Sequence, residues 1–453
     1  MRSTLFVLTI FASTIVSMAQ APDLERPLPQ SWQYTDGLSQ TLPDDDAWWR
    51  AFNDPVLDSL ISLGVNNNFD LSMAVRRMDA AARQVDAARA AYYPTIGINA
   101  AYTRSRVSEV NSNTYNLGAT ASWEIDLFGR ITAGVKQKKA AYRASRAEWT
   151  GAMVSLAGNI ASTYVQFRQY EEQLAVAEEN TVTQDSIAGL VRARYEAGLG
   201  AKPQLEQALS LMYSTRSTIP SLRTSVAKTR SALALLVGLY PADIDALLSA
   251  SRGLPDYHLM VKAGVPADLL RRRPDIARAE ANVASAAAAA GIAKKDYLPT
   301  LTINGNVGVG ADKPGDMFTS RGFTYSVTPT LSWTVFDGFA RHANVAAAKD
   351  ELMAQIDNYN YTVMNAYSEV DNAIIAYGNT LGQIADCRDA LNAAVEFLNL
   401  QLDLYTQGLS TFSDVATAQQ SVLNYANSEI GAHAAALTSL IDLYEALGGG
   451  FDL

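Results

Sequence analysis

The sequence predicts an α+β membrane protein in which four β-strands accompany very long helices. Residues 301–309 and 323–335 alternate apolar or aromatic side chains with Thr, Ser, Asn and Gly, a period of two that is typical of strands with one apolar and one polar face. Residues 96–102 and 117–127 alternate in the same way. Residues 131–193 contain no proline and are rich in Ala, Gln, Glu, Arg and Leu, which favours one continuous helix.

The four strands predict a membrane-spanning β-barrel that one chain cannot complete. A tilted strand needs roughly 9–11 residues to cross a bilayer, and an apolar face opposite a hydroxyl-rich face is typical of such barrels. Closure takes about eight strands, and an open sheet edge leaves N–H and C=O groups without partners in lipid. Strands in a membrane therefore require an oligomer that shares one barrel.

Composition and motifs argue against nucleic-acid binding and against catalysis. The chain has 453 residues and a net charge of −10, an acidic balance that disfavours nucleic acid as a partner. One cysteine, Cys387, and three scattered histidines give neither a disulfide framework nor metal-ligand spacing. Phosphate-binding glycine loops and hydrolase motifs are also missing from the sequence. We expect no enzyme activity, no metal and no cofactor.

The first residues have the parts of a signal peptide. Arg2 supplies a positive end, residues 5–16 form an apolar core, and Ser17-Met18-Ala19 offers small residues for cleavage. We therefore expect a signal peptide at residues 1–19. Residues 20–50 are polar and rich in proline, and we expect an extended segment lying on the surface of the body.

Residues 51–238 predict a helix, a β-hairpin and a helical hairpin. A short helix opens at Asp54-Pro55, and a second spans residues 68–93. The first β-hairpin follows, with its turn at about residues 104–115. The long helix from Ile131 ends before Gly198-Leu199-Gly200, and a return helix runs from Pro203 to the stop at Gly238.

Residues 239–266 resemble a linker, and residues 267–453 repeat the same order of elements. A short helix ends at Arg271-Arg272-Arg273, and Pro274 starts a helix that runs to Tyr297. Three arginines suggest nucleic acid only superficially, because cations at a helix C-terminus complement the macrodipole and cap carbonyl groups. The second hairpin, a proline-free helix over 341–403, a break at Gly408 and a helix to about residue 447 complete the chain.

The two halves match at an offset of about 210 residues, which predicts an internal duplication. Trp123 corresponds to Trp333, and Gly238 corresponds to Gly448. The breaks Gly198-Leu199 and Gly408-Leu409 also correspond. A protomer with two such repeats is suited to building a tube in a symmetric ring.

The chain resembles the TolC-like outer-membrane factors, and within them the OprM/NodT-like branch of multidrug-efflux outer-membrane channels. The resemblance covers nearly the whole mature chain, and residues 270–276 (Leu-Arg-Arg-Arg-Pro-Asp-Ile) are its most specific part. The other residues that carry it are Trp48, Trp49, Phe52, Asp54, Pro55, Leu57, Leu60, Asn68, Phe69, Asp70, Leu71, Glu280, Gly291, Pro299 and the two Gly-Leu turns.

This resemblance implies a homotrimer in the outer membrane with a large periplasmic portion. Three chains would share a 12-stranded β-barrel, four strands per chain, continuous with a long periplasmic α-helical barrel. The implied partners are outer-membrane lipids, a periplasmic adaptor (membrane fusion) protein and an inner-membrane pump of the RND type. Many members of the branch carry a lipidated cysteine after the signal peptide. The sequence has none there, so we expect no lipid anchor.

The resemblance places a gate at the helix breaks, the periplasmic mouth of the family's tunnel. Tyr405 and Asp414 match the Tyr and Asp that close the entrance, and Gln204 takes the acidic position of the first repeat. Ser410 replaces a basic residue that often tethers the closed gate. Asp414 also has a local explanation, because Thr411-x-x-Asp414 is nearly a capping box and the dipole favours an acid there. The two interpretations are compatible.

The exposed turns are expected to dock the adaptor. The candidate residues are Gly198, Leu199, Gly408, Leu409 and Ser410. The alternative for both glycines is an ordinary helix C-cap. Aromatic residues near the strand ends suggest a membrane-interface girdle, with core packing as the alternative. They are Tyr92, Tyr93, Tyr297, Phe128 and Phe336.

Three functions remain open from the sequence. The first is an outer-membrane channel of a tripartite efflux system, through which drugs leave passively. The second is the outer-membrane duct of a type I protein secretion system, which a neighbouring gene for an ABC exporter would favour. The third is a periplasmic coiled-coil scaffold, which salt or carbonate washing would release from membranes.

Overall fold

The structure is a computed structural model that describes most of the two predicted repeats. It describes residues 27–34, 38–39, 47–107, 109–250, 253–255, 261–262, 265–268 and 272–449. The expected signal peptide, most of the extended segment 20–50 and part of the linker 239–266 lie outside these residues. Among the described residues, no helix combines the length and the apolar character needed to cross a membrane.

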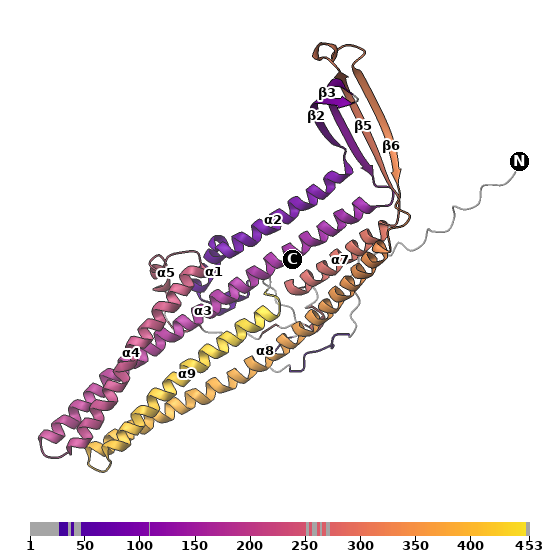
Figure 1. Cartoon of the computed structure of the whole chain (residues 1–453). Coiled ribbons are helices and arrows are strands. Elements are labelled where there is room, and N and C mark those ends of the chain that lie inside the picture. The colour runs from indigo at the N-terminus through magenta and orange to yellow at the C-terminus, as the bar shows by residue number, and fades with distance from the viewer. Residues whose placement is uncertain are drawn as a thin grey trace. The chain divides into compact units, whose positions relative to one another are not determined.

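The first repeat contains four long helices and a β-hairpin (Figure 1). Its elements are α1 (Pro55–Asn67), α2 (Phe69–Arg89), β2 (Thr95–Val107), β3 (Val110–Ile125), α3 (Arg130–Glu196) and α4 (Lys202–Leu236). Asp54 caps α1, since its carboxylate accepts hydrogen bonds from the backbone N–H groups of Val56 and Leu57. Smaller elements are β1 (Leu38–Ser39), α5 (Asp245–Leu248) and the 3₁₀ turns Trp48–Phe52 and Ala90–Tyr92.

The second repeat follows the same order. Its elements are α7 (Pro274–Lys295), β5 (Thr300–Ala311), β6 (Phe323–Ser332), α8 (Ala340–Thr406) and α9 (Phe412–Ala446), with 3₁₀ turns at Pro266–Asp268 and Pro314–Asp316. A short strand β4 (Val261–Lys262) pairs in parallel with β1.

The predicted duplication is confirmed by the helical hairpins. Helices α3 and α8 each have 67 residues, and α4 and α9 each have 35. The first residues of α3 and α8, Arg130 and Ala340, lie 210 positions apart, as do Lys202 and Phe412 at the starts of α4 and α9. Such agreement over two helices means that each repeat encodes the same hairpin.

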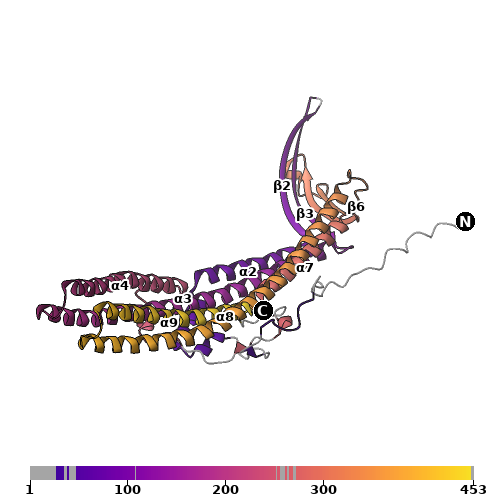
Figure 2. The same ribbon diagram turned by 90° about the horizontal axis from the view of Figure 1, so that it is seen from below.

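The described residues divide into two compact units, and each unit takes segments from both repeats. The first unit includes Ala81–Ala144 and Ala279–Asn360, which hold the four long strands. The second consists of Leu28–Ala80, Ser145–Arg278 and Tyr361–Leu453, which hold the helical hairpins. The turns of these hairpins lie at the same end of the second unit (Figures 1 and 2).

The first unit contains one antiparallel sheet in the order β2-β3-β5-β6. Its register aligns the predicted faces across all four strands. On one face Trp123 lies opposite Ile303, which lies opposite Pro329. On the other face Ser122 lies opposite Asn304, and their side-chain oxygens are 3.0 Å apart. The alternation in the sequence therefore becomes one continuous apolar face and one continuous polar face.

Two strand boundaries differ from the sequence prediction. The first hairpin has a tight turn, because β2 continues to Val107 and β3 starts at Val110. The predicted turn over residues 104–115 was wrong because its polar side chains occupy paired strands. Strand β6 ends at Ser332 instead of Val335. Its partner β5 begins at Thr300, and Pro299 before it has no N–H to donate.

The aromatic residues at the helical end of the sheet are exposed on the protomer. Tyr92, Tyr93, Tyr297, Phe128 and Phe336 are all at least one-third exposed. Trp123 and Trp333 donate indole N–H bonds to the carbonyls of Tyr92 and Tyr297 at 2.9 and 3.0 Å. Exposure favours the interface-girdle interpretation over packing within the core of the chain.

In each repeat, a polar side chain from another element caps the C-terminal end of the return helix. In the first, the Asn68 side-chain amide donates to the carbonyl of Leu236 at 2.9 Å. In the second, the buried Arg273 guanidinium donates to the carbonyl of Ala446 at 2.8 Å. Arginine does cap a helix carbonyl, as predicted, but that carbonyl belongs to α9.

Arg273 also forms a buried charge network just before the start of α7. It bonds the carboxylates of Asp275 at 2.7 Å and Glu369 at 2.6 Å. Arg273→Ala leaves both acids and the Ala446 carbonyl without this donor. We expect a loss of about 2–4 kcal/mol of unfolding free energy, because breaking a buried charge network strands its remaining partners. Thermal unfolding of the detergent-extracted protein measures this loss of stability.

The neighbouring Arg272→Ala is the matched control. Arg272 is half-buried, and no ion pair joins it to any of the residues that the structure describes. An equal loss of stability in both variants would contradict a specific role for Arg273.

Candidate functional site at the hairpin tips

The two hairpin tips have the same backbone geometry. Gly198 and Gly408 have φ values of +74° and +77°, a left-handed conformation that favours glycine. The N–H of Leu199 bonds the carbonyl of Arg194 at 2.8 Å, and the N–H of Leu409 bonds that of Leu404 at 2.8 Å. These bonds define a Schellman C-cap at the end of each long helix, so both glycines do have a capping role.

The leucine after each glycine is the most prominent apolar group of its tip. Leu199 and Leu409 are each 72% exposed. A C-cap of this type needs the glycine but does not need an apolar side chain that faces water. Two equivalent leucines, one from each repeat, are therefore exposed at the tips of the second unit.

Asp414 and Gln204 occupy the same position in the two repeats, the third residue of the return helix. The Asp414 carboxylate accepts bonds from the Thr411 N–H at 3.0 Å and the Thr411 hydroxyl at 2.7 Å. The Gln204 side-chain oxygen lies 3.4 Å from the N–H of Ala201. Each side chain thus caps its own helix, and the capping interpretation of Asp414 is correct.

These bonds also fix the charge of Asp414. Hydrogen bonds from the Thr411 side chain, the Thr411 backbone and the Ser410 hydroxyl hold the pKa of this carboxyl below its usual value. A depressed pKa keeps the group ionised at neutral pH, and the capping contribution is lost only as the pH falls through that lowered value. Asp414 is exposed, so each chain presents one fixed negative charge there.

Ser410 does not provide a cationic tether. Its hydroxyl oxygen lies 2.7 Å from the side-chain oxygen of Gln401 and 3.1 Å from the carboxylate of Asp414. A single hydroxyl proton can serve only one of these acceptors at a time. Ser410 therefore links the end of α8 to the start of α9 within one hairpin.

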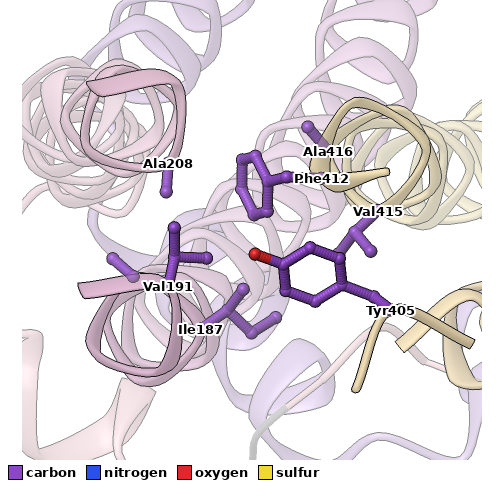
Figure 3. Close-up of a cluster of buried hydrophobic side chains, with 8 residues drawn as sticks. Ile187, Val191, Ala208, Tyr405, Phe412, Val415 and Ala416 are labelled. Atoms are coloured by element: carbon purple, nitrogen blue, oxygen red, sulfur yellow. The ribbon is translucent and has the colours of Figure 1, made fainter. Parts of the chain in front are cut away.

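Tyr405 lies inside a cluster of apolar side chains that joins the two hairpins (Figure 3). It is 3% exposed, and its ring contacts that of Phe412 edge-on at 5.9 Å between centroids. Its hydroxyl is buried and has no hydrogen-bond partner in the described part of the chain. The other members are Ile187, Ala188, Val191, Ala208, Val415 and Ala416. In this protomer Tyr405 packs the tip and does not face solvent.

Arg194 connects the first hairpin to the second, and the sequence did not reveal it. Its guanidinium donates to the carbonyls of Tyr405 and Thr406, both at 3.1 Å. The same group stacks over the Tyr405 ring, 4.9 Å from the centroid. A basic residue in the last turn of α3 suggests only an interaction with its own helix, whereas here it caps the neighbouring α8.

The described residues contain no group of three or more His, Cys, Asp or Glu side chains that could hold a metal ion. The tips combine apolar packing, helix caps and the hydrogen-bonded carboxylate of Asp414.

Comparison with known proteins identifies the class of protein to which the chain belongs. The chain is 28% identical to Nodulation protein T of Rhizobium leguminosarum bv. trifolii, over 93% of this chain and 91% of the relative. It is 29% identical to the pyoverdine export outer membrane protein OpmQ of Pseudomonas putida, over 93% and 92%. The solved structure of the outer-membrane channel OprN superposes with a TM-score of 0.87 at 27% identity, covering 95% of this chain and 99% of that one.

The fold is therefore that of an outer-membrane channel, and the helical portion is periplasmic. The profile of the outer membrane efflux proteins matches residues 60–239 and 265–449, which is most of the sequence and one segment for each repeat. The chain belongs to the outer membrane efflux protein family. The resemblance seen in the sequence is confirmed.

Replacing Arg194 is expected to loosen the tip of the second hairpin. Arg194→Gln removes the charged donor to two carbonyls and the contact with the Tyr405 ring. Hydrogen bonds to charged groups contribute about 1.5–3 kcal/mol, so backbone amides of residues 406–411 should exchange roughly tenfold faster or more. Hydrogen exchange with mass spectrometry measures this.

Arg192→Gln provides the matched control, because Arg192 is exposed on the same helix. Exchange at the tip should stay unchanged in that variant. Equal exchange in the Arg194→Gln and unmodified proteins would mean that the apolar cluster alone holds the hairpins together.

Proposed function

We propose that this protein is the outer-membrane exit duct of a tripartite efflux system for small molecules. Three copies complete one barrel and one periplasmic helical tunnel. A periplasmic adaptor joins the tunnel to an inner-membrane pump of the RND type. The pump supplies the energy, and solutes diffuse through the duct.

The four-stranded sheet carries the proposal. Its edge strands β2 and β6 have no further partner strand in the described part of the chain, and an unpaired edge is not tolerated in lipid. Three copies supply 12 strands, within the range of closed outer-membrane barrels. Because the chain is an outer-membrane protein of an efflux family, a shared barrel gives the edges their partners.

The nature of the cargo is part of the proposal. The relative from Pseudomonas putida is named for pyoverdine export, and the sequence most specific to the drug-efflux branch, residues 270–276, includes the structural Arg273. Small molecules are therefore the favoured cargo. Genes for a pump beside this one would support the assignment, and a neighbouring ABC exporter would favour protein secretion.

The gate is proposed to lie where the tips of the three chains converge. The exposed Asp414 would form a ring of three carboxylates, whereas Gln204 contributes no charge at the equivalent position. Tyr405 acts indirectly, because its cluster and the Arg194 bonds set the position of the hairpin that carries Asp414. Adaptor binding at the leucines would shift these hairpins towards the open arrangement.

Removing the Asp414 carboxylate should alter ion selectivity. A ring of acidic groups concentrates cations at a narrow opening. In planar bilayers, Asp414→Ala and Asp414→Asn should both reduce the preference for K⁺ over Cl⁻, and the alanine variant should also leak more because it lacks the cap. Reversal potentials and conductance measure the two effects.

Gln204→Glu tests the same ring from the other repeat. It adds a carboxylate at the equivalent position and should raise the cation preference. Asp389→Asn removes an exposed acid from α8 well before the tip and should leave selectivity unchanged. If neither Asp414 variant changed selectivity or conductance at any pH, Asp414 would be a helix cap only.

A charge on the tip leucines should weaken adaptor binding without unfolding the duct. Leu199→Asp and Leu409→Asp replace side chains that are 72% exposed and bury no charge within the chain. At an apolar contact, each charge would cost its desolvation energy on binding. Crosslinking to the adaptor in cells should fall at least about tenfold, an energy of about 1.4 kcal/mol.

Leu235→Asp is the matched control. Leu235 is 76% exposed on α4 and lies at the opposite end of that helix from the tip. Adaptor crosslinking that survives both tip substitutions would place the docking surface elsewhere.

A further inference from the structure

The first β-hairpin is longer than the second. β3 pairs with β5 only as far as Tyr115 and Ala311. Beyond this point β2 and β3 pair with each other alone, from Thr103 and Thr114 to Val107 and Val110. Because the periplasmic helices join the opposite ends of the strands, this extension lies at the outer surface of the membrane.

Along this extension the apolar face of β2 becomes positively charged. Side chains at alternate positions share a face of a strand, and Ile96, Ile98 and Tyr102 lie on the apolar face of β2. The same alternation places Arg104 and Arg106 on that face, and both are exposed. The outward face therefore ends in an aromatic residue followed by two cations.

Two tyrosines, Tyr102 and Tyr115, mark the edge of the apolar band. The rings of Tyr102 and Tyr115 lie 4.8 Å apart on paired strands, and the Tyr102 hydroxyl donates to Asn113 at 3.1 Å. Tyrosines with an apolar body and a bonded hydroxyl are typical of the membrane interface. Two residues further on, at about 3.3 Å per residue and a tilt of about 45°, Arg104 stands about 5 Å above them, at headgroup depth.

Both arginines are without an acidic partner in the described part of the chain. No ion pair joins Arg104 or Arg106 to any residue that the structure describes, including Glu109 in the adjoining turn. Two arginines near the opposite ends of the strands differ. Arg130 pairs with Glu124 at 2.7 Å, and Arg341 pairs with Asp337 at 2.7 Å.

We propose that Arg104 and Arg106 bind the phosphate groups of an outer-leaflet lipid whose acyl chains lie on the apolar face below. Charge complementarity identifies the headgroup, because an arginine fork matches phosphate oxygens. The continuous apolar face identifies the rest of the ligand as a lipid. The inference rests on the proposed barrel and the outer-membrane location, and it does not depend on the cargo or on the adaptor.

This contact would anchor the barrel at a defined depth. Each cation at an anionic lipid surface strengthens the contact, so each protomer gains from both arginines. The paired cations at the periplasmic end cannot contribute in the same way. The outer surface would therefore fix the lipid contact, and the periplasmic end would stay available for changes in the tunnel.

Native mass spectrometry of the detergent-extracted protein tests the proposal with bisphosphorylated lipid A as the probe. Phosphatidylethanolamine and lipid A lacking one phosphate serve as comparison lipids. The unmodified protein should retain the bisphosphorylated form most tightly. Arg104→Gln with Arg106→Gln should weaken its binding roughly 30-fold, the equivalent of about 2 kcal/mol for two charges, and should leave phosphatidylethanolamine binding unchanged.

A charge swap tests the role of the face. Thr103→Arg with Arg104→Gln keeps the net charge but moves one cation to the polar face. It should lose binding as Arg104→Gln alone does. Should the double arginine variant fail to assemble, the single variants Arg104→Gln and Arg106→Gln give the same comparison, with several-fold weaker binding expected for each.

Three results would overturn the proposal. One is unchanged retention of bisphosphorylated lipid A in the double variant, another is full retention in the charge swap, and the third is competition by phosphate. Competition by inorganic phosphate at millimolar concentration would mean that the arginines bind any phosphate, so a lipid would not be their specific ligand. Each variant's oligomeric mass and channel conductance, recorded in parallel, distinguish these results from a failure of the proposed duct.

Discussion

The hydrogen-bonding groups along the edges of the four-stranded sheet set the main constraint on this molecule. In water, the unpaired N–H and C=O groups of β2 and β6 would bond solvent. In a bilayer each unpaired group costs several kcal/mol. Because the sheet of an outer-membrane protein must satisfy those edges, the barrel needs strands from other copies. Oligomerisation is thus a consequence of backbone chemistry as well as of function.

In a symmetric oligomer, every feature of one chain occurs once in each copy. Within the chain, the duplication already provides two copies of each hairpin, and the copies keep their backbone geometry at Gly198 and Gly408. They differ in side chains. Gln204 and Asp414 are equivalent in position but differ in charge, and Arg194 corresponds in position to Leu404. The chain can therefore use one repeat for the fixed charge and the other for the arginine that holds the neighbouring hairpin.

Much of this architecture follows from local signals in the sequence. Glycine marks both tips because a left-handed C-cap requires it, and alternation over residues 301–309 predicts a strand because its side chains point to opposite faces. The same locality explains the errors. Residues 104–115 carry Arg, Ser and Asn, so their strands were mistaken for a turn, although pairing between the strands decides their structure.

Contacts between distant segments could not be predicted in this way. The bond from Arg194 to Tyr405 spans 211 positions, and the burial of Tyr405 depends on α3 and α9 together. The sequence gives the helix that each residue belongs to but not the face that meets another helix. The positions of the two hairpin turns were consequently predicted correctly, whereas the arginine that joins the hairpins was missed.

The local bonds of Asp414 limit how the proposed gate can stay closed. The carboxylate accepts two bonds from Thr411 and lies 3.1 Å from the Ser410 hydroxyl within its own hairpin. Hydrogen-bond donors of its own hairpin therefore occupy this carboxylate. Three Asp414 carboxylates brought together, one from each copy, would repel one another. In the proposed gate, a closed mouth would then depend on the packing around Tyr405 and on Arg194. In the proposed duct, an adaptor that contacts the exposed leucines would act on that packing.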